Sequence, residues 1–167
     1  MENVPIPPEA AQDPVEKNVP GQGYGRDPER TPMRWDSGAN AGFTTGKPWL
    51  PLGEDYGKVN VSAEREDPRS VLSLYRGLIS LRQSEPALMV GSYQAVPAQG
   101  DVLAYVREAA GSRFFVALNL GHETQRVELP EAGRIAVSTG MGREGEAVSG
   151  PLELRGDEGV VVELRSA

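Results

Sequence analysis

The acidic residues that could do chemistry gather in one irregular stretch near the start of the chain. Asp27, Glu29 and Asp36 are carboxylates, and glycoside hydrolysis is commonly carried out by a pair of such groups. On an irregular loop, however, their spacing fixes no distance between them, so turn caps and salt bridges are the stronger interpretation. The carboxylates by themselves therefore predict no catalytic pair.

Three arginines occur in the same stretch as these carboxylates. Arg26, Arg30 and Arg34 recur every four residues, and Trp35 follows directly. Planar guanidinium forks beside an aromatic ring suit the recognition of sugar hydroxyls and carboxylates. The stretch is thus a candidate binding segment, although this pattern alone does not identify the ligand.

Two further features are better explained by structure than by chemistry. His122, the single histidine, lies between Gly121 and Glu123, where a hairpin turn is expected and no nucleophile is at hand. The glycine-rich run at residues 21–25 has no strand before it, no helix after it and no Gly-Lys-Ser/Thr signature. We expect an exposed turn histidine and a surface loop.

The overall composition excludes several classes of site and partner. The 167 residues include no cysteine and one histidine, and their formal net charge is −7. Disulfides, thiolate metal sites and multi-histidine metal cages are therefore ruled out, and the acidic balance argues against nucleic acid or anionic membrane as partner. The apolar runs are too short to span a bilayer, and the N-terminus lacks a signal peptide. We expect a soluble, cytoplasmic protein that uses no metal and no cofactor.

Proline is concentrated in the first part of the chain. Ten of the fourteen prolines lie at or before Pro68, so residues 1–67 cannot hold much regular helix or central strand. Disorder is one interpretation, but both tryptophans lie here, and disordered segments are poor in aromatic residues. We expect a long irregular loop that packs against another surface.

A helix is expected over residues 68–85. Asp67 suits the N-cap and Pro68 the first helical position. Apolar residues, among them Leu74, Leu78 and Ile79, form a face so broad that it requires an extensive partner surface.

From Met89 onward the hydrophobic period changes to two. Glycine-containing turns separate about seven short segments, which predicts an antiparallel β-sandwich. The expected strands are Met89–Ala95, Val102–Arg107, Arg113–Leu120, Thr124–Leu129, Arg134–Thr139, Pro151–Leu154 and Val160–Arg165.

A series of motifs resembles the α-glucosidase and oligo-1,6-glucosidase branch of the α-amylase family (glycoside hydrolase family 13). The motifs, which occur in order, are Gly-Arg-Asp-Pro-Glu-Arg-Thr-Pro-Met-Arg-Trp-Asp at 25–36, Asn-Ala-Gly-Phe-Thr at 40–44, Lys-Pro-Trp-Leu-Pro at 47–51, Val-Asn-Val at 59–61 and Glu-Asp-Pro at 66–68, followed by the helix. Together they cover almost all of residues 3–90. The C-terminal strands resemble that family's C-terminal domain more loosely.

The resemblance implies a domain organisation. The family's catalytic domain is a (β/α)₈ barrel, so residues 1–86 are expected to be its C-terminal piece, with a loop at 1–67 and the last barrel helix at 68–85. Residues 87–167 are expected to form the β-sandwich C-terminal domain. The loop would then lie at the end of the barrel that carries the active site, and the helix would pack on barrel elements that precede this sequence.

The resemblance also implies which functional residues the chain carries. The family's aspartate nucleophile, glutamate acid/base and second aspartate all follow earlier barrel strands, so no catalytic residue is expected here. Arg30 matches the family arginine that binds the non-reducing-end glucose, and Trp35 is expected to support that loop. The family usually has glutamine where this chain has Arg34.

We therefore expect the C-terminal portion of a retaining, exo-acting α-glucosidase that acts on malto- or isomalto-oligosaccharides and is inactive alone. The expected partners are an α-gluco-oligosaccharide in the intact enzyme and the N-terminal portion of the barrel. Two alternatives are a non-catalytic sandwich that binds carbohydrate or stabilises structure, and one half of a split glucosidase.

Overall fold

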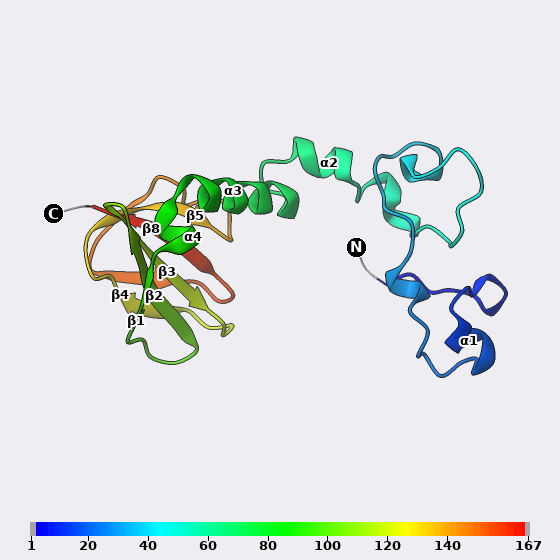
Figure 1. Cartoon of the computed structure of the whole chain (residues 1–167), viewed down its shortest axis with the longest axis horizontal. Coiled ribbons are helices and arrows are strands. Elements are labelled where there is room, and N and C mark those ends of the chain that lie inside the picture. The colour runs from blue at the N-terminus through cyan, green and yellow to red at the C-terminus, as the bar shows by residue number, and fades with distance from the viewer. Residues whose placement is uncertain (1–2, 166–167) are drawn as a thin grey trace. The chain divides into compact units, whose positions relative to one another are not determined.

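The computed structural model describes residues 3–165 and divides the chain into two compact units, with the boundary in the sequence between Ser73 and Leu74. We call residues 3–73 the N-terminal unit and residues 74–165 the C-terminal unit, and treat each separately (Figure 1). The expected domain boundary at residue 86 concerns membership of a barrel and stays a prediction.

The N-terminal unit consists of turns and short helices, and its described residues contain no strand. This confirms the long irregular segment expected from its prolines. The helices, with η denoting 3₁₀-helix, are η1 (Pro8–Ala10), α1 (Pro14–Asn18), η2 (Asp27–Glu29), η3 (Ala39–Gly42), η4 (Glu54–Gly57) and α2 (Val61–Glu66).

The long helix α3 (Val71–Ser84) begins three residues later than the sequence predicts and ends one residue earlier. Residues 68–70 form a turn instead, in which the Asp67 carboxylate accepts from the Arg69 amide (2.8 Å). The Ser70 hydroxyl accepts from the Ser73 amide (3.1 Å) and so caps the helix. The prediction of Pro68 as first helical residue is therefore wrong, because serine takes the capping position.

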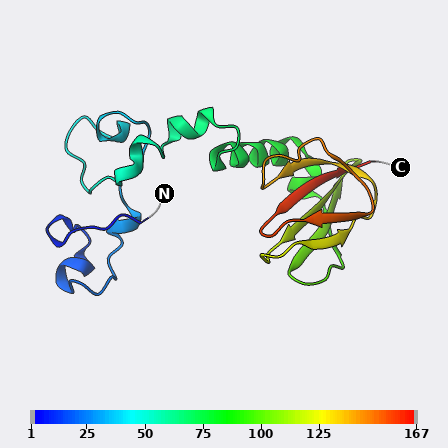
Figure 2. The ribbon, with the colours of Figure 1, turned by 180° about the vertical axis from the view of Figure 1, so that it is seen from behind.

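The β-rich C-terminal unit contains two antiparallel sheets (Figure 2). One sheet has six strands in the order β1-β2-β3-β8-β5-β6, and the other pairs β4 with β7. The strands are β1 (Ser92–Val96), β2 (Val102–Ala109), β3 (Ser112–Asn119), β4 (Gln125–Glu128), β5 (Gly133–Ser138), β6 (Ala147–Val148), β7 (Pro151–Leu154) and β8 (Gly159–Leu164). A β-rich fold was expected from the alternating pattern, and the structure confirms it.

Two local predictions differ from the structure. Met89 and Val90 belong to a short helix, α4 (Pro86–Val90), rather than to the first strand. Pro86 occupies the first helical position, where its missing N–H costs nothing, and the apolar run after it is too short to distinguish helix from strand. The two-residue strand β6 was not expected at all.

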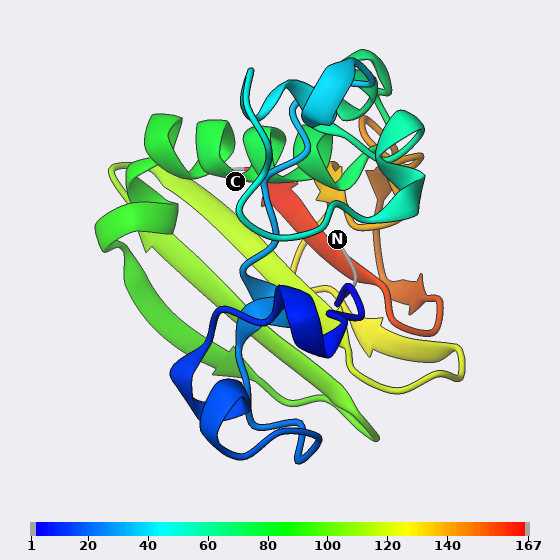
Figure 3. The same ribbon diagram turned by 90° about the vertical axis from the view of Figure 1, so that its right-hand side faces the viewer.

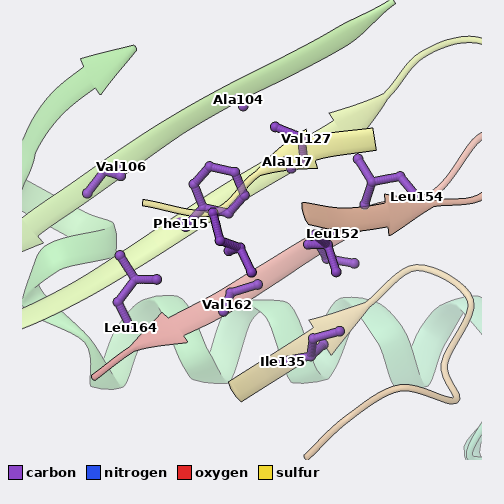
Figure 4. Close-up of a cluster of buried hydrophobic side chains, with 12 residues drawn as sticks. Ala104, Val106, Phe115, Ala117, Val127, Ile135, Leu152, Leu154, Val162 and Leu164 are labelled. Carbon is purple, nitrogen blue, oxygen red and sulfur yellow. The ribbon is translucent and has the colours of Figure 1, made fainter. Parts of the chain in front are cut away.

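The hydrophobic core of the C-terminal unit lies between the two sheets (Figure 4). Phe115 of β3 and Val162 of β8 are fully buried in it, and Leu152 and Leu154 of β7 supply the opposite layer. Successive side chains point to opposite faces of a strand, so Val116 and Val161 lie on the outer face of the same sheet. Helix α3 crosses this outer face (Figure 3), where Leu78 and Leu81 lie near Val116 and Val161.

A search of the described helices finds none long and apolar enough to cross a membrane.

Candidate functional site

The candidate segment at residues 26–35 is anchored by a buried carboxylate. Asp27, which opens η2, is 2 % exposed. Its Oδ2 accepts hydrogen bonds from the backbone amides of Gln12 (2.6 Å) and Asp13 (2.9 Å). Buried polar groups are normally satisfied by such hydrogen bonds. Asp27 thus ties the segment to the start of α1 and acts as a structural group, not as a free acid or base.

A second buried carboxylate, Asp13, links the start of α1 back to Arg26. Its Oδ1 caps α1 by accepting from the Val15 amide (2.8 Å), and its Oδ2 accepts from the amide (3.3 Å) and Nε (3.4 Å) of Arg26. The bond from Val15 is the largest cause that lowers the pKa of Asp13 below its ordinary value, and the bonds from Arg26 lower it further. Asp13 therefore stays ionised beside two arginines.

Arg30 is the second of these arginines. Its Nη1 lies 4.0 Å from Asp13 Oδ2, and 47 % of its side chain is exposed. The backbone amide of Arg30 donates to the Asp27 carbonyl (3.0 Å). The two aspartates therefore fix the backbone at Arg30, while its guanidinium remains accessible to a ligand.

Trp35 connects three parts of the N-terminal unit through its backbone. Its amide donates to the Ala41 carbonyl (2.8 Å), and its carbonyl accepts from the amide (3.0 Å) and hydroxyl (3.1 Å) of Ser62. Trp35 as a whole is about half exposed. The backbone bonds fit the expected supporting role, and that role remains a prediction.

Arg34, between these two residues, is buried. Its Nη1 pairs with the Asp55 carboxylate at 2.6 Å, and its carbonyl accepts from the Val61 amide (3.0 Å). A β-carbon at Gly53 would approach the Arg34 guanidinium closely, so a side chain there would displace it. Because the guanidinium is buried and paired, Arg34 links two parts of the unit rather than presenting a charge to a ligand.

The other chemical candidates take structural roles or stay isolated. Asp36 accepts from the Gly38 amide (2.7 Å) and so closes a turn, and the Glu29 side chain is exposed. Asp27 and Asp36 both serve local backbone groups, so no carboxylate pair forms among these three. His122 is an exposed turn residue that pairs with Asp157. Among residues 3–165, no group of three or more His, Asp or Glu side chains could hold a metal ion.

Sequence reasoning did not find Asp13 or Asp55. The signal for Asp13 was present, because an aspartate directly before a proline is typical of a helix start. Its bonds to Arg26 and Arg30 could not be predicted, because these arginines lie 13 and 17 positions later in the chain, beyond α1 and a turn-rich segment. Nothing in the spacing of Asp55 indicates an ion pair with Arg34.

A family comparison identifies the N-terminal half of the chain. Residues 1–91 match the family model described as the catalytic domain of alpha amylase. The chain belongs to the α-amylase family. This confirms the resemblance drawn from the motifs at 25–68.

Characterised members of the α-amylase family match with substantial identity. Trehalose-6-phosphate hydrolase of Escherichia coli is 46 % identical over 101 residues, which cover 60 % of this chain and 18 % of that protein. Oligo-1,6-glucosidase of Parageobacillus thermoglucosidasius is 38 % identical over 108 residues, which cover 64 % of this chain and 19 % of that protein. The relatives are glycosidases of the expected kind.

Solved structures of the family match nearly the whole chain. Trehalulose synthase MutB from Pseudomonas mesoacidophila MX-45 gives a TM-score of 0.77 at 31 % identity, covering 98 % of this chain and 33 % of that one. The chain thus spans about a fifth of the length of the curated relatives it matches and about a third of this solved structure.

Proposed function

We propose that this chain is the C-terminal portion of a retaining, exo-acting α-glucosidase. It would supply an active-site loop, the last helix of a (β/α)₈ barrel and a structural β-sandwich. The observation that carries the proposal is the match of residues 1–91 to the family's catalytic domain, together with a segment at 26–35 whose Arg30 is accessible and whose backbone is tied down.

The proposed substrate is an α-gluco-oligosaccharide. Relatives carry the names oligo-1,6-glucosidase and glucan 1,6-alpha-glucosidase, and an arginine fork suits paired sugar hydroxyls. Arg30 would hold the non-reducing-end glucose, and Trp35 would support the loop through its bonds to Ala41 and Ser62.

The chain alone is proposed to be inactive. In the family the three catalytic carboxylates follow earlier barrel strands, and Asp27 and Asp36 serve backbone amides here. Binding a sugar without a nucleophile and an acid/base leaves the reaction barrier almost unchanged. The proposed partner is therefore the N-terminal portion of the barrel, whether on the same polypeptide or on a separate one.

Hydrolysis of p-nitrophenyl α-glucoside tests this function. We expect no turnover from the 167-residue chain and measurable turnover when the polypeptide encoded directly upstream is added. In that mixture, Arg30→Ala should lower kcat/KM about tenfold or more, as expected for a lost bond to a charged group. Arg65→Ala is the matched control, because Arg65 is an exposed arginine of α2. Turnover by the chain alone would contradict the proposal.

The sandwich is proposed to stabilise the enzyme rather than to bind sugar. Its aromatic pair, Tyr93 and Tyr105, has ring centroids 5.1 Å apart, but the rings are inclined by 32°. Two inclined rings do not offer one flat stacking surface to a sugar. Calorimetry with maltotetraose should show no heat for the chain, and saturable heat lost in Tyr93→Ala would favour the binding module instead.

A further inference from the structure

A cavity of about 290 Å³ lies within the C-terminal unit, between α3, α4 and the outer face of the six-stranded sheet. Apolar side chains form most of its wall, including Leu78 and Leu81 of α3, Leu88 of α4, and Val116 and Val161 of the sheet. The proposed function assigns no task to this cavity.

Two arginines line the same cavity. Arg82, in the last turn of α3, donates from Nη1 to the Leu88 carbonyl (2.8 Å). Arg107 of β2 donates from Nε to the Ser92 carbonyl (3.0 Å) and from Nη2 to the Gly91 carbonyl (2.9 Å). The three carbonyls lie close together in sequence: Leu88 is in α4, Ser92 begins β1, and Gly91 connects the two elements. Both guanidinium groups are thus held at one edge of the cavity.

Neither guanidinium has an acidic partner. No carboxylate of the described residues lies within 4.0 Å of Arg82 or Arg107, whereas Arg113 and Arg143 each pair with two glutamates. Two like charges that line one cavity without a counter-ion create a positive field there, which attracts an anion. The spare N–H groups of two guanidinium forks suit a carboxylate.

The volume of the cavity and its apolar wall indicate a ligand that carries a hydrocarbon part besides its carboxylate. Its volume of about 290 Å³ is about twice that of the ~150 Å³ apolar cavity in which one benzene binds. We propose that this cavity binds a small amphipathic carboxylate, with its hydrocarbon part between α3 and the sheet and its head group on Arg82 and Arg107. This site is independent of the glucosidase function.

Titration calorimetry of the 167-residue chain at neutral pH tests the site with three probes of equal chain length. Octanoate should bind, because it supplies both the hydrocarbon and the anion. Neutral 1-octanol should bind about tenfold more weakly, since it lacks the charge-assisted bonds. Octylamine, which is cationic at this pH, should give no saturable heat.

Substitutions locate the binding in the cavity. Arg82→Gln keeps a side-chain N–H near the Leu88 carbonyl and removes the charge, so we expect octanoate affinity to fall about tenfold while 1-octanol affinity is unchanged. Val161→Phe should fill the cavity and abolish binding of both. Arg126→Gln is the matched control, because Arg126 lies on the two-stranded sheet and should leave all affinities unchanged. Circular dichroism establishes that each variant is folded.

Several outcomes would overturn the proposal. These are no octanoate binding at millimolar concentration, equal affinities for octanoate and 1-octanol, or the same loss in Arg126→Gln as in Arg82→Gln. Sedimentation that shows a dimer of the wild type and a monomer of Val161→Phe would mean that a second copy of the chain covers the cavity instead.

Discussion

His122 and Asp157 form an exposed ion pair between two turns of the sandwich. Nδ1 of His122 lies 3.0 Å from Asp157 Oδ2, and this hydrogen bond is the main reason that the pKa of His122 is raised above 6.5. A raised pKa means that the pair's contribution to stability is fully present below the unfolded-state pKa, and is lost as pH rises through the folded-state pKa.

A proton NMR titration of the His122 ring checks whether Asp157 raises the pKa of His122. The wild type should titrate above 6.5, and Asp157→Asn should move the pKa back towards that value. Asparagine tolerates the left-handed backbone at this position, where φ is 58°, so the turn should persist. Glu123→Gln removes a neighbouring charge as a control. An unchanged pKa in Asp157→Asn would contradict the assignment of the shift.

Asp13 gives the opposite pH dependence. Its pKa is lowered, chiefly by the bond from the Val15 amide, so its stabilising contribution is present above the unfolded-state pKa and is lost as pH falls through the folded-state pKa. We expect Asp13→Asn to be less stable than the wild type at pH 7, and the difference to shrink as the pH falls below 3.8. Chemical unfolding at several pH values, followed by tryptophan fluorescence, measures this difference in the free energy of unfolding. A difference independent of pH would contradict this role.

The surroundings of a side chain are harder to predict from sequence than the residues of a contiguous motif. Arg30 could be singled out as a candidate because its motif is local and contiguous, and its role in binding stays a prediction. The contacts of Asp13 with Arg26 and Arg30 could not be predicted. They depend on turns between these residues, and the geometry of those turns is set by irregular backbone hydrogen bonds. Likewise, the burial of Arg34 depends on Asp55 and on the absence of a side chain at Gly53.

At the element scale, helix α3 has two different apolar faces. Leu78 is half-buried and lines the cavity with the sheet, whereas Val71, Tyr75 and Ile79, spaced one turn apart, are exposed. The expected broad apolar face is therefore only partly covered. In the proposed enzyme the exposed side is where the rest of the barrel would pack.

Substitutions on the two faces of α3 should have unequal effects. Leu78→Ala should lower the free energy of unfolding by about 2 kcal/mol, because it removes buried methyl groups and enlarges a cavity. Ile79→Gln, on the exposed side, should change it by about 0.5 kcal/mol or less. Urea unfolding followed by circular dichroism measures both. Equal losses would mean that the exposed face is covered in solution, for example by self-association.

A glycine at the start of β5 is required by close packing. A β-carbon on Gly133 would lie 2.4 Å from the Glu163 carbonyl oxygen and 2.7 Å from Val162 Cγ1. Because the nearest atom belongs to the backbone of β8, it cannot rotate away. Gly133→Ala should therefore destabilise the sandwich by about 1–3 kcal/mol through overpacking. Gly140→Ala is the control, since a β-carbon there has no neighbour within 4 Å, and the two variants should differ clearly in thermal unfolding.

Some helices and strands could be predicted from the sequence and others could not. Alternation at β3 and β8 predicted strands because a two-residue period fits one buried face. Pairing β8 between β3 and β5 was not predictable, since strand order depends on contacts distant in sequence. The start of α3 was predicted too early because Pro68 suits a first helical position, which the Ser70 cap excludes. Helix α4 was missed because a proline marks the end of a preceding helix as readily as the start of a new one.

For the whole molecule, burial is distributed unequally between the two units. The hydrophobic core cluster lies entirely in the C-terminal unit. In the described N-terminal unit, the buried apolar residues are Val4, Ala11, Pro32, Ala41 and Leu50. Stability follows buried apolar area, and regions that bury little open more readily. The N-terminal unit should therefore be the less stable one in the isolated chain.

Hydrogen exchange of the 167-residue chain measures this difference directly. We expect the amides of β3 and β8, which pair with each other in the middle of the six-stranded sheet, to exchange slowly. The Trp35 amide, although bonded to the Ala41 carbonyl, should exchange about a hundredfold faster or more, equivalent to ~2.8 kcal/mol at 1.4 kcal/mol per tenfold. Adding the upstream polypeptide should protect Trp35 and leave β3 unchanged. Equal protection of both regions in the chain alone would show that the N-terminal unit is stable by itself. Its low burial would then no longer be a reason to expect that it packs against the rest of a barrel.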